Sequence, residues 1–291
     1  MASADGPAPN GGVIHDIGYQ RYTGTRLGRR HIVLALYVHS LRAAFGLGRS
    51  VKAKIFPGIV VGLGFVVAVV AVAIRTQTGE VALTYLQFTD HLEIPVVLFL
   101  AVVAPELVCR DLRSGVLPLY FSRPVRRADY ALAKLAATIS AVWLLLAGPL
   151  LLMFLGGVFA QTGGPSGAWR ELTDFLGGLG YAAITAIVLG AVAVPLASLS
   201  SRRAVAAVIV VVAFIVTTPV LGVLEAVGGT TVQQLAPLIN PVTMLIGLET
   251  WIYRNNQLEI GGYGPLYLVA ALVLVGGCVA LLVVRYRKVV A

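Results

Sequence analysis

Few residues in this 291-residue chain have the types and spacing that enzymatic chemistry requires. The four histidines are scattered and form no pair that could ligate a haem or a metal, and Cys109 and Cys278 stand apart in apolar runs. The string Gly164–Gly167 (GPSG) places a serine between glycines, yet no histidine lies in an apolar segment to activate it, so we interpret the string as a turn in an external loop. The chain also lacks the GxxxxGK(S/T) loop that cradles nucleotide phosphates. The sequence therefore predicts that this chain binds no cofactor or metal and has no catalytic site.

The spacing of charged residues within the long apolar runs suggests one ion pair. Glu106 and Arg110 are four residues apart, in the order that favours a pair on a helix. Glu106 is the only acidic residue in these runs, so the mid-membrane carboxylates typical of proton-coupled transporters are nearly absent. We interpret the pair as structural. Lys134, at the start of another apolar run, is expected to extend to the membrane interface.

The composition identifies the broad class of protein. Hydrophobic residues make up 58% of the chain and charged residues only 12%, and the mean hydropathy is +0.89. Soluble domains carry about 25% charged residues, and disordered chains are poor in apolar ones. The sequence therefore predicts an integral membrane protein. In such a protein the net charge of +9 reports the sidedness of the loops and does not indicate a nucleic-acid partner.

Six apolar segments are long enough to cross the bilayer, which takes about 20 residues as a helix. The second is short and contains Pro95, Pro105 and Glu106, so we expect it to extend past Arg110 or back to His91. The fold expected is an all-α, polytopic membrane protein with six transmembrane helices. The predicted spans cover about 55–74, 94–109, 135–159, 176–199, 204–224 and 266–284.

The basic residues orient these spans. If six spans alternate, one side of the membrane carries only Arg75, Arg170 and Arg254, and the other carries the remaining 19 of the 22 basic residues. Loops rich in Lys and Arg stay in the cytoplasm. We therefore predict a multi-pass protein of the cytoplasmic (inner) membrane with both termini in the cytoplasm.

The segments outside the spans have distinct characters. Residues 1–16 resemble a disordered tail, and residues 17–54 form a basic segment that precedes the transmembrane domain of residues 55–291. From His31 to Leu47, apolar residues recur at helical spacing, which suits an amphipathic helix in the membrane interface or, alternatively, an ordinary basic helix beside the membrane. The external loop 225–265 is broken at Pro237 and at Asn240-Pro241, and could hold short re-entrant helices or a small external cap.

The loop between the second and third spans carries the most specific pattern. It opens with a mixed charged and apolar stretch: Arg110, Asp111, Arg113, Gly115, Val116, Leu117, Leu119 and Tyr120. It returns to the membrane through a second set: Ser122, Arg123, Pro124, Arg126, Arg127 and Lys134. With the six-span layout, the basic entry helix and the long last external loop, this pattern resembles permease subunits of type-2 ATP-binding-cassette (ABC) exporters.

The resemblance implies a partner and a mechanism. In such exporters this loop forms a coupling helix that docks on a separate ATPase subunit, which binds ATP and Mg, and the permease pairs with a second, identical or related permease. The mixed chemistry suits docking, because charges set register and apolar atoms are buried. The cargo expected is an apolar or amphipathic small molecule, such as a drug, an antibiotic or a lipid, moved outward.

Other interpretations remain at this point. The loop could be a hairpin without a partner, and the chain could be an ion-gradient-driven secondary transporter or a non-transporting membrane scaffold or sensor. Gly58 and Gly62 form a small-xxx-small pair on the first span. That pair suits packing within the chain as well as a seam between two permeases.

Overall fold

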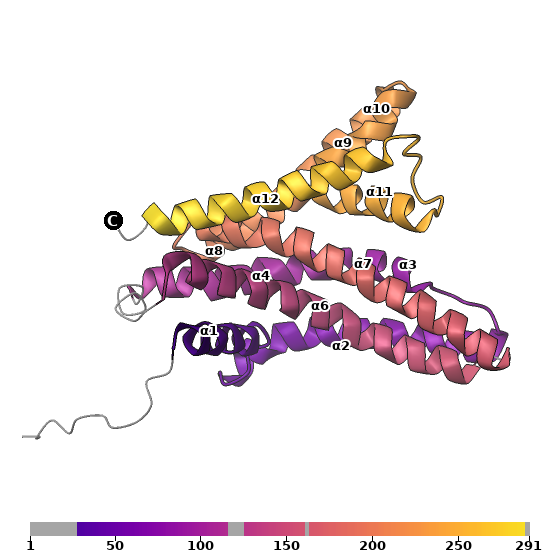
Figure 1. Ribbon diagram of the computed structural model, residues 1–291, viewed down its shortest axis with the longest axis horizontal. Coiled ribbons are helices and arrows are strands. Elements are labelled where there is room, and N and C mark those ends of the chain that lie inside the picture. The colour runs from indigo at the N-terminus through magenta and orange to yellow at the C-terminus, as the bar shows by residue number, and fades with distance from the viewer. Residues whose placement is uncertain (1–27, 116–124, 161–162, 289–291) are drawn as a thin grey trace, which may run out of the picture.

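The computed structural model describes residues 28–115, 125–160 and 163–288, and every regular element in that part of the chain is helical. The long helices run side by side along one axis of the molecule (Figure 1). The elements are α1 (Arg29–Ala44), α2 (Val51–Thr78), α3 (Tyr85–His91), α4 (Glu93–Arg113), α6 (Arg127–Ala160), α7 (Gly164–Ser198), α8 (Arg203–Ile215), α9 (Thr217–Val227), α10 (Thr230–Leu235), the short 3-10 helix η1 (Ala236–Ile239), α11 (Pro241–Tyr253) and α12 (Gly264–Lys288).

The length and composition of the helices support the membrane-protein class. Five are long and apolar enough to cross a bilayer: α2, α6, α7, the segment Arg203–Leu224 and α12. Two bent pairs, α3 with α4 and α10–η1 with α11, raise the number to seven if each counts as one span. Five predicted spans coincide with the five long candidates, and the sixth lies in the α3–α4 pair. The predicted count of six falls within this range.

A bend of 53° separates α3 from α4, and the sequence explains it. Helix α3 starts with a capping box in which Thr84 accepts a hydrogen bond from the Gln87 amide and Gln87 accepts one from Thr84. Pro95 has no amide hydrogen, and in a continuous helix its ring would clash with the carbonyl of His91. The chain therefore starts a new helix at Glu93, which continues to Arg113. Of the two extensions considered, the one past Arg110 is confirmed, whereas toward His91 the helix is interrupted by the bend.

Helix α7 begins twelve residues before the span predicted at 176–199. Gly163 caps it and Pro165 stands in its first turn, a position that lacks an amide partner in any helix. The GPSG string, predicted as a loop turn, thus opens the helix. As a consequence, Glu171 and Asp174 lie on α7 instead of in a loop.

The region after α8 folds into a bent helical hairpin. Helix α9 and α10 project away from the bundle, and α11 turns back beneath them (Figure 1). The axis turns by 118° between the α10–η1 segment and α11, at the predicted break before Pro241. This geometry is that of a re-entrant loop or a broken span.

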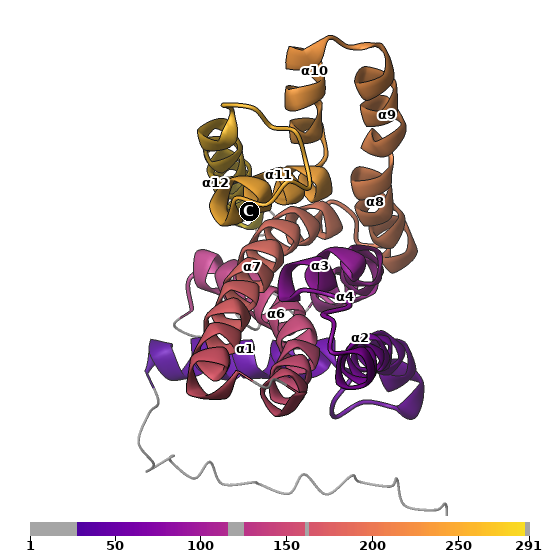
Figure 2. The ribbon, with the colours of Figure 1, turned by 90° about the vertical axis from the view of Figure 1, so that its right-hand side faces the viewer.

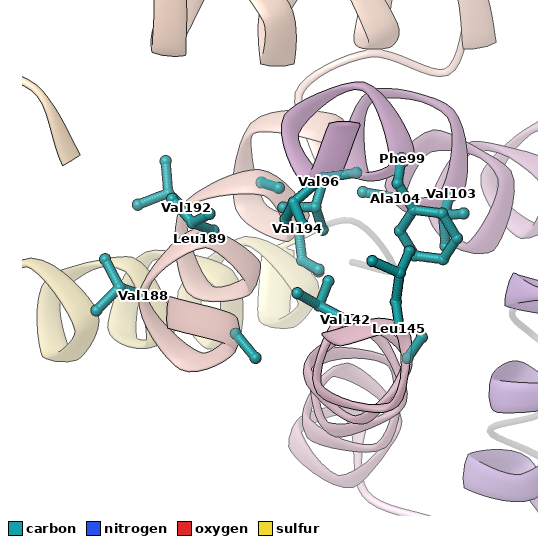
Figure 3. Packing of buried hydrophobic residues seen from close by; sticks show 14 of the residues in the cluster. Val96, Phe99, Val103, Ala104, Val142, Leu145, Val188, Leu189, Val192 and Val194 are labelled. Carbon is teal, nitrogen blue, oxygen red and sulfur yellow. The ribbon is translucent and has the colours of Figure 1, made fainter. Parts of the chain in front are cut away.

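The core of the molecule lies around α7, which is the most buried of the long helices. Its valines and leucines meet apolar side chains of α4 and α6 (Figure 3). In the view along the bundle, α2 and α4 lie on one side of α6 and α7, and α8 to α12 lie above them (Figure 2). The buried residues that Figure 3 labels are Val96, Phe99, Val103, Ala104, Val142, Leu145, Val188, Leu189, Val192 and Val194.

Helix α1 lies across the bundle axis, as the predicted interfacial helix would (Figure 2). Its buried positions include Leu36 and Ser40, and the Tyr37 hydroxyl donates a hydrogen bond to Ser140 Oγ of α6 at 2.9 Å. Leu34 and Val38 point outward and are 59% and 42% exposed. One face of α1 is therefore attached to the bundle and another is free for lipid. The predicted tail of residues 1–16 lies outside the described residues.

Candidate functional site

Charged residues divide between the two ends of the bundle. The starts of α2, α6 and α8 and the ends of α4 and α12 meet at one end, on the left in Figure 1, which we call the basic end. Its described cations outnumber its acids, which are Glu106, Asp111 and Asp129. Toward the opposite end lie most of the other acids in the described ranges, with few cations, and we call this the acidic end. Its acidic residues are Glu80, Asp90, Glu93, Glu171, Asp174, Glu249 and Glu259.

The first residues of the predicted coupling loop belong to a helix. Arg110, Asp111 and Arg113 form the last turn of α4, which ends where Gly115 adopts the left-handed backbone conformation (φ +64°). Arg126 and Arg127 stand at the start of α6. The rest of the predicted docking and return residues lie outside the described part of the chain: Val116, Leu117, Leu119, Tyr120, Ser122, Arg123 and Pro124.

Asp111 connects the two helices at the base of this loop. Its Oδ2 lies 2.9 Å from Nζ of Lys134, and the Tyr130 hydroxyl donates a hydrogen bond to the same oxygen. The Lys134 side chain is only 6% exposed, and its ammonium lies 5.5 Å from the centre of the Tyr130 ring. The expectation that Lys134 extends to the interface was wrong. Because α6 begins at Arg127, Lys134 lies two turns inside the helix and faces α4.

Glu106 has other ion-pair partners than the one expected. Its carboxylate pairs with Arg49, which precedes α2, and with Arg203 at the start of α8, where Nη1 and Oε2 are 2.5 Å apart. Within the described residues no ion pair joins Glu106 to Arg110, whose side chain is exposed. The predicted Glu106–Arg110 pair is therefore corrected. Glu106 instead connects three elements that are distant in sequence.

A third carboxylate attaches α1 to the same region. Asp129, in the first turn of α6, accepts hydrogen bonds from Arg29 Nε at 2.6 Å and Nη2 at 2.5 Å. Its Oδ2 also accepts the Arg126 amide at 3.2 Å, which satisfies a free donor of the helix start. Two-point contact of this kind fixes orientation as well as distance. The starts of α1 and α6 are thus fixed to each other.

The two glycines predicted to pack against another helix, Gly58 and Gly62, have open space beside them. An added Cβ at Gly58 or Gly62 would meet no atom within 4 Å, whereas one at Gly64 would approach Cγ of Pro149 at 3.1 Å. The close approach of α2 to α6 therefore uses Gly64. Within the described residues, the Gly58–Gly62 face of α2 contacts nothing.

The acidic end contains buried carboxylates that the sequence reasoning missed. Glu249 on α11 is fully buried and accepts hydrogen bonds from Asn255 Nδ2 at 2.5 Å and Gln257 Nε2 at 3.3 Å. Asp90 accepts one from the Tyr181 hydroxyl at 2.7 Å. One oxygen each of Asp90, Glu93 and Glu249 is buried without a hydrogen-bond partner, and no ion pair to another described residue involves these three. Acids are therefore more numerous in candidate spans than the sequence indicated.

A pocket of about 570 Å³ opens beside this group. At its wall, Arg75 of α2 pairs with Glu171 of α7 through Nη1–Oε1 (2.8 Å) and Nη2–Oε2 (2.5 Å), and the Tyr85 hydroxyl also donates to Glu171. Apolar side chains of α2 and α6 and polar side chains that follow α11 complete the lining. The latter include Asn255 and Gln257, the donors to Glu249. The pocket thus combines an apolar wall with a polar one.

Comparison with models of known protein families and with curated proteins finds no match. In the described part of the chain, no group of three His, Cys, Asp or Glu side chains is arranged to hold a metal ion. The arrangement has two features that bear on function. Ion pairs join several helices at the basic end, and the acidic end has a pocket of small-molecule size with an apolar and a polar wall.

Proposed function

We propose that this chain is the permease subunit of an ABC exporter of the cytoplasmic membrane. Two permeases pair, and each binds a separate ATPase subunit through the cytoplasmic loop after α4. Closure of the ATPase dimer around ATP pushes this loop, tilts the attached helices and opens a path outward for an apolar or amphipathic small molecule. Work at one site is thereby transmitted through rigid elements with two arrangements.

The observation that carries the proposal is the fixed base of the loop. On its two sides, Asp111 of α4 and Lys134 of α6 form a buried ion pair, so the ends of α4 and α6 move as one body. The Arg29–Asp129 contact adds α1 to that body. A force applied between Gly115 and Val125 would therefore tilt helices and not merely bend a loop. This rigidity is what a coupling element requires, and the sequence pattern of the loop resembles that of one.

The pocket at the acidic end supports the proposed class of cargo. Its volume of about 570 Å³ lies in the range of small-molecule sites, which is about 300–1,000 Å³. Ala71, Val72 and Met153 offer apolar contact, and the Arg75–Glu171 pair and Asp174 offer polar contact. An amphipathic molecule matches both.

The proposal is tested by cross-linking and by charge reversal. A photo-reactive amino acid at position 113 should cross-link to an ATPase subunit in native membranes, and one at position 170 should not, because Arg170 is exposed at the opposite end. Arg113→Glu should reduce ATPase co-purification at least about tenfold, since an attractive contact becomes a repulsive one of more than about 1.4 kcal/mol. Arg170→Glu is the matched control. Replacement of residues 116–124 by a Gly/Ser linker of equal length should abolish co-purification and spare the Asp111–Lys134 pair.

Full co-purification with the linker variant would refute the proposal. An ATPase complex that is stable but drives no transport in proteoliposomes would instead indicate the scaffold or sensor function.

The buried carboxylates favour a second candidate, a secondary transporter driven by an ion gradient. Carboxylates at membrane depth are the groups that carry a coupling proton, and Glu249 is fully buried. In this case the chain reconstituted alone would accumulate solute when a proton gradient is imposed, and Glu249→Gln would abolish the accumulation. The exporter proposal predicts no gradient-driven uptake by the chain alone, with or without that substitution.

A further inference from the structure

Two adjoining pockets at the basic end share the Arg49–Glu106–Arg203 ion-pair cluster. One, of about 280 Å³, extends toward Lys52, Pro57 and Val103, and the other, of about 450 Å³, extends toward Arg110, Arg113 and Ser201. We treat them together and call them the basic pocket. Arg110 and Arg113, which line part of it, also belong to the stretch that is proposed to dock on the ATPase subunit, whereas the other lining residues take no part in that proposal.

The basic pocket has a large excess of positive charge. Five cations line it, namely Arg49, Lys52, Arg110, Arg113 and Arg203, and Glu106 is the only acid among its lining residues. Glu106 already pairs with Arg49 and Arg203, so it cannot neutralise the others. Arginine does not lose its proton in proteins. The remaining positive charge favours the binding of an anion at this place.

Two helix starts at the same place add to this preference. Helix α2 begins at Val51 and α8 at Arg203, and neither has an acidic residue in its first turn or a side-chain hydrogen bond at its cap. Helix starts carry free amide donors and a partial positive charge, which an acidic side chain usually offsets. Both helix starts lack such an acidic side chain, and five cations lie beside them. A phosphate would satisfy the amides and the guanidinium groups together.

The surroundings of the pocket point to a phosphate that carries a hydrocarbon chain. Pro57, Val102 and Val103 continue the lining directly from the cationic part. Lys52, Ile59 and Leu63 follow one stripe of α2 at helical spacing, and Ile59 and Leu63 are 62% and 45% exposed. The pocket lies where the candidate spans α2 and Arg203–Leu224 begin, and the ends of membrane-spanning helices generally lie near the lipid headgroups.

We propose that the basic pocket binds the phosphate of an anionic phospholipid, with an acyl chain along the Lys52–Ile59–Leu63 stripe of α2. The headgroup then bridges the starts of α2 and α8 and the end of α4. Free inorganic phosphate offers the same anion without an acyl chain. An acidic segment of a partner protein offers neither the phosphate nor the acyl chain.

The test uses the full chain, purified alone in detergent and delipidated, so its outcome is independent of any ATPase. Phosphatidylglycerol is titrated in native mass spectrometry against phosphatidylcholine and inorganic phosphate. We expect saturable binding of phosphatidylglycerol that phosphatidylcholine does not match. Lys52→Gln/Arg110→Gln should weaken it about 25-fold, because each cation near the headgroup contributes about fivefold. Neither side chain forms an ion pair with a described residue, so the fold does not depend on them.

The matched control removes the same charge from the other end. Arg170→Gln/Arg254→Gln should bind phosphatidylglycerol as the unmodified chain does. Equal affinity of the Lys52/Arg110 variant and its control would overturn the proposal. Inorganic phosphate that competes at the lipid's own concentration would show that the acyl chain contributes nothing and would also overturn it. Equal binding of phosphatidylglycerol and phosphatidylcholine by the unmodified chain would overturn it as well.

Discussion

The three carboxylates at the basic end form contacts between elements. Glu106, Asp111 and Asp129 each hold a cation that comes from another element. The most buried of these contacts is Asp111–Lys134, whose side chains are 14% and 6% exposed. Removal of one charge from such a pair leaves the other buried and unsatisfied, which costs more than the pair itself contributes. This asymmetry gives a residue-scale prediction.

Lys134→Met should destabilise the protein by about 3–5 kcal/mol, the usual cost of leaving one member of a buried pair behind. The double variant Lys134→Met/Asp111→Leu should recover most of that loss, because both charges are gone and the volume is filled. Thermal unfolding in detergent measures both. The exposed Arg170→Met serves as the control and should melt within a few degrees of the unmodified protein. A single Lys134 variant that melts with the control would show that the pair is not a structural contact.

At the scale of elements, apolar run length predicts the existence of helices well and their ends poorly. Five of the six expected spans are long helices, and the chain bends at the predicted break of Asn240-Pro241, whereas the bend between α3 and α4 was not predicted. Helix α7 starts twelve residues early, because polar turns such as the one around Glu171 are accepted where another helix supplies Arg75. Run length does not contain that information.

The contacts of the candidate site were likewise hard to predict from the sequence. The spacing of Glu106 and Arg110 predicts an ion pair within one helix, but the carboxylate is held by Arg49 and Arg203, which only the tertiary fold brings near. The carboxylates at the acidic end escaped notice for the same reason. Asp90 and Glu249 are distant in sequence, and their shared burial depends on the hairpin around α11 folding back on α3 and α7.

One residue fixes that hairpin. Asn240 is almost fully buried and caps α11 by accepting the Val242 amide at 2.8 Å. Its Nδ2 also donates to the Phe214 carbonyl at 3.0 Å and to Thr218 Oγ1 at 3.3 Å. Phe214 and Thr218 flank the junction of α8 and α9, where the helix path is interrupted at Val216. A single amide therefore connects two helix breaks.

Asn240→Ala should cost about 2 kcal/mol, because it removes a cap and leaves a buried carbonyl with one partner fewer. The loss should be local to the hairpin. Hydrogen exchange followed by mass spectrometry should show at least about tenfold faster exchange in 230–253 and unchanged exchange in 180–195. Asn256→Ala, at an exposed position, is the control. Uniform exchange rates across both variants would contradict the role assigned to Asn240.

At the scale of the whole molecule, the remaining feature is the apolar surface that no other part of the described chain covers. α2 and α12 are mostly uncovered along their apolar windows, at 28% and 17% buried, as expected of helices that face lipid or another subunit. Lipid accepts any apolar side chain, whereas a second helix packs best on small residues that let backbones approach. On α2 the Gly58–Gly62 face is open, while its neighbour Gly64 is filled by Pro149. That face is where we expect the second permease subunit to pack.

Gly58→Ile/Gly62→Ile should therefore separate pairing from folding. Because a Cβ at either position meets no atom of the described chain, the monomer should fold and melt normally. Two isoleucines on a close helix seam would hold the backbones apart, and the dimer fraction counted by single-molecule photobleaching in nanodiscs should fall at least about tenfold. Gly276→Ile on α12, at an equally open position, controls for added bulk on a lipid-facing helix. Loss of pairing in that control alone would place the seam on α12, and loss in neither would mean that the subunits do not meet through these glycines.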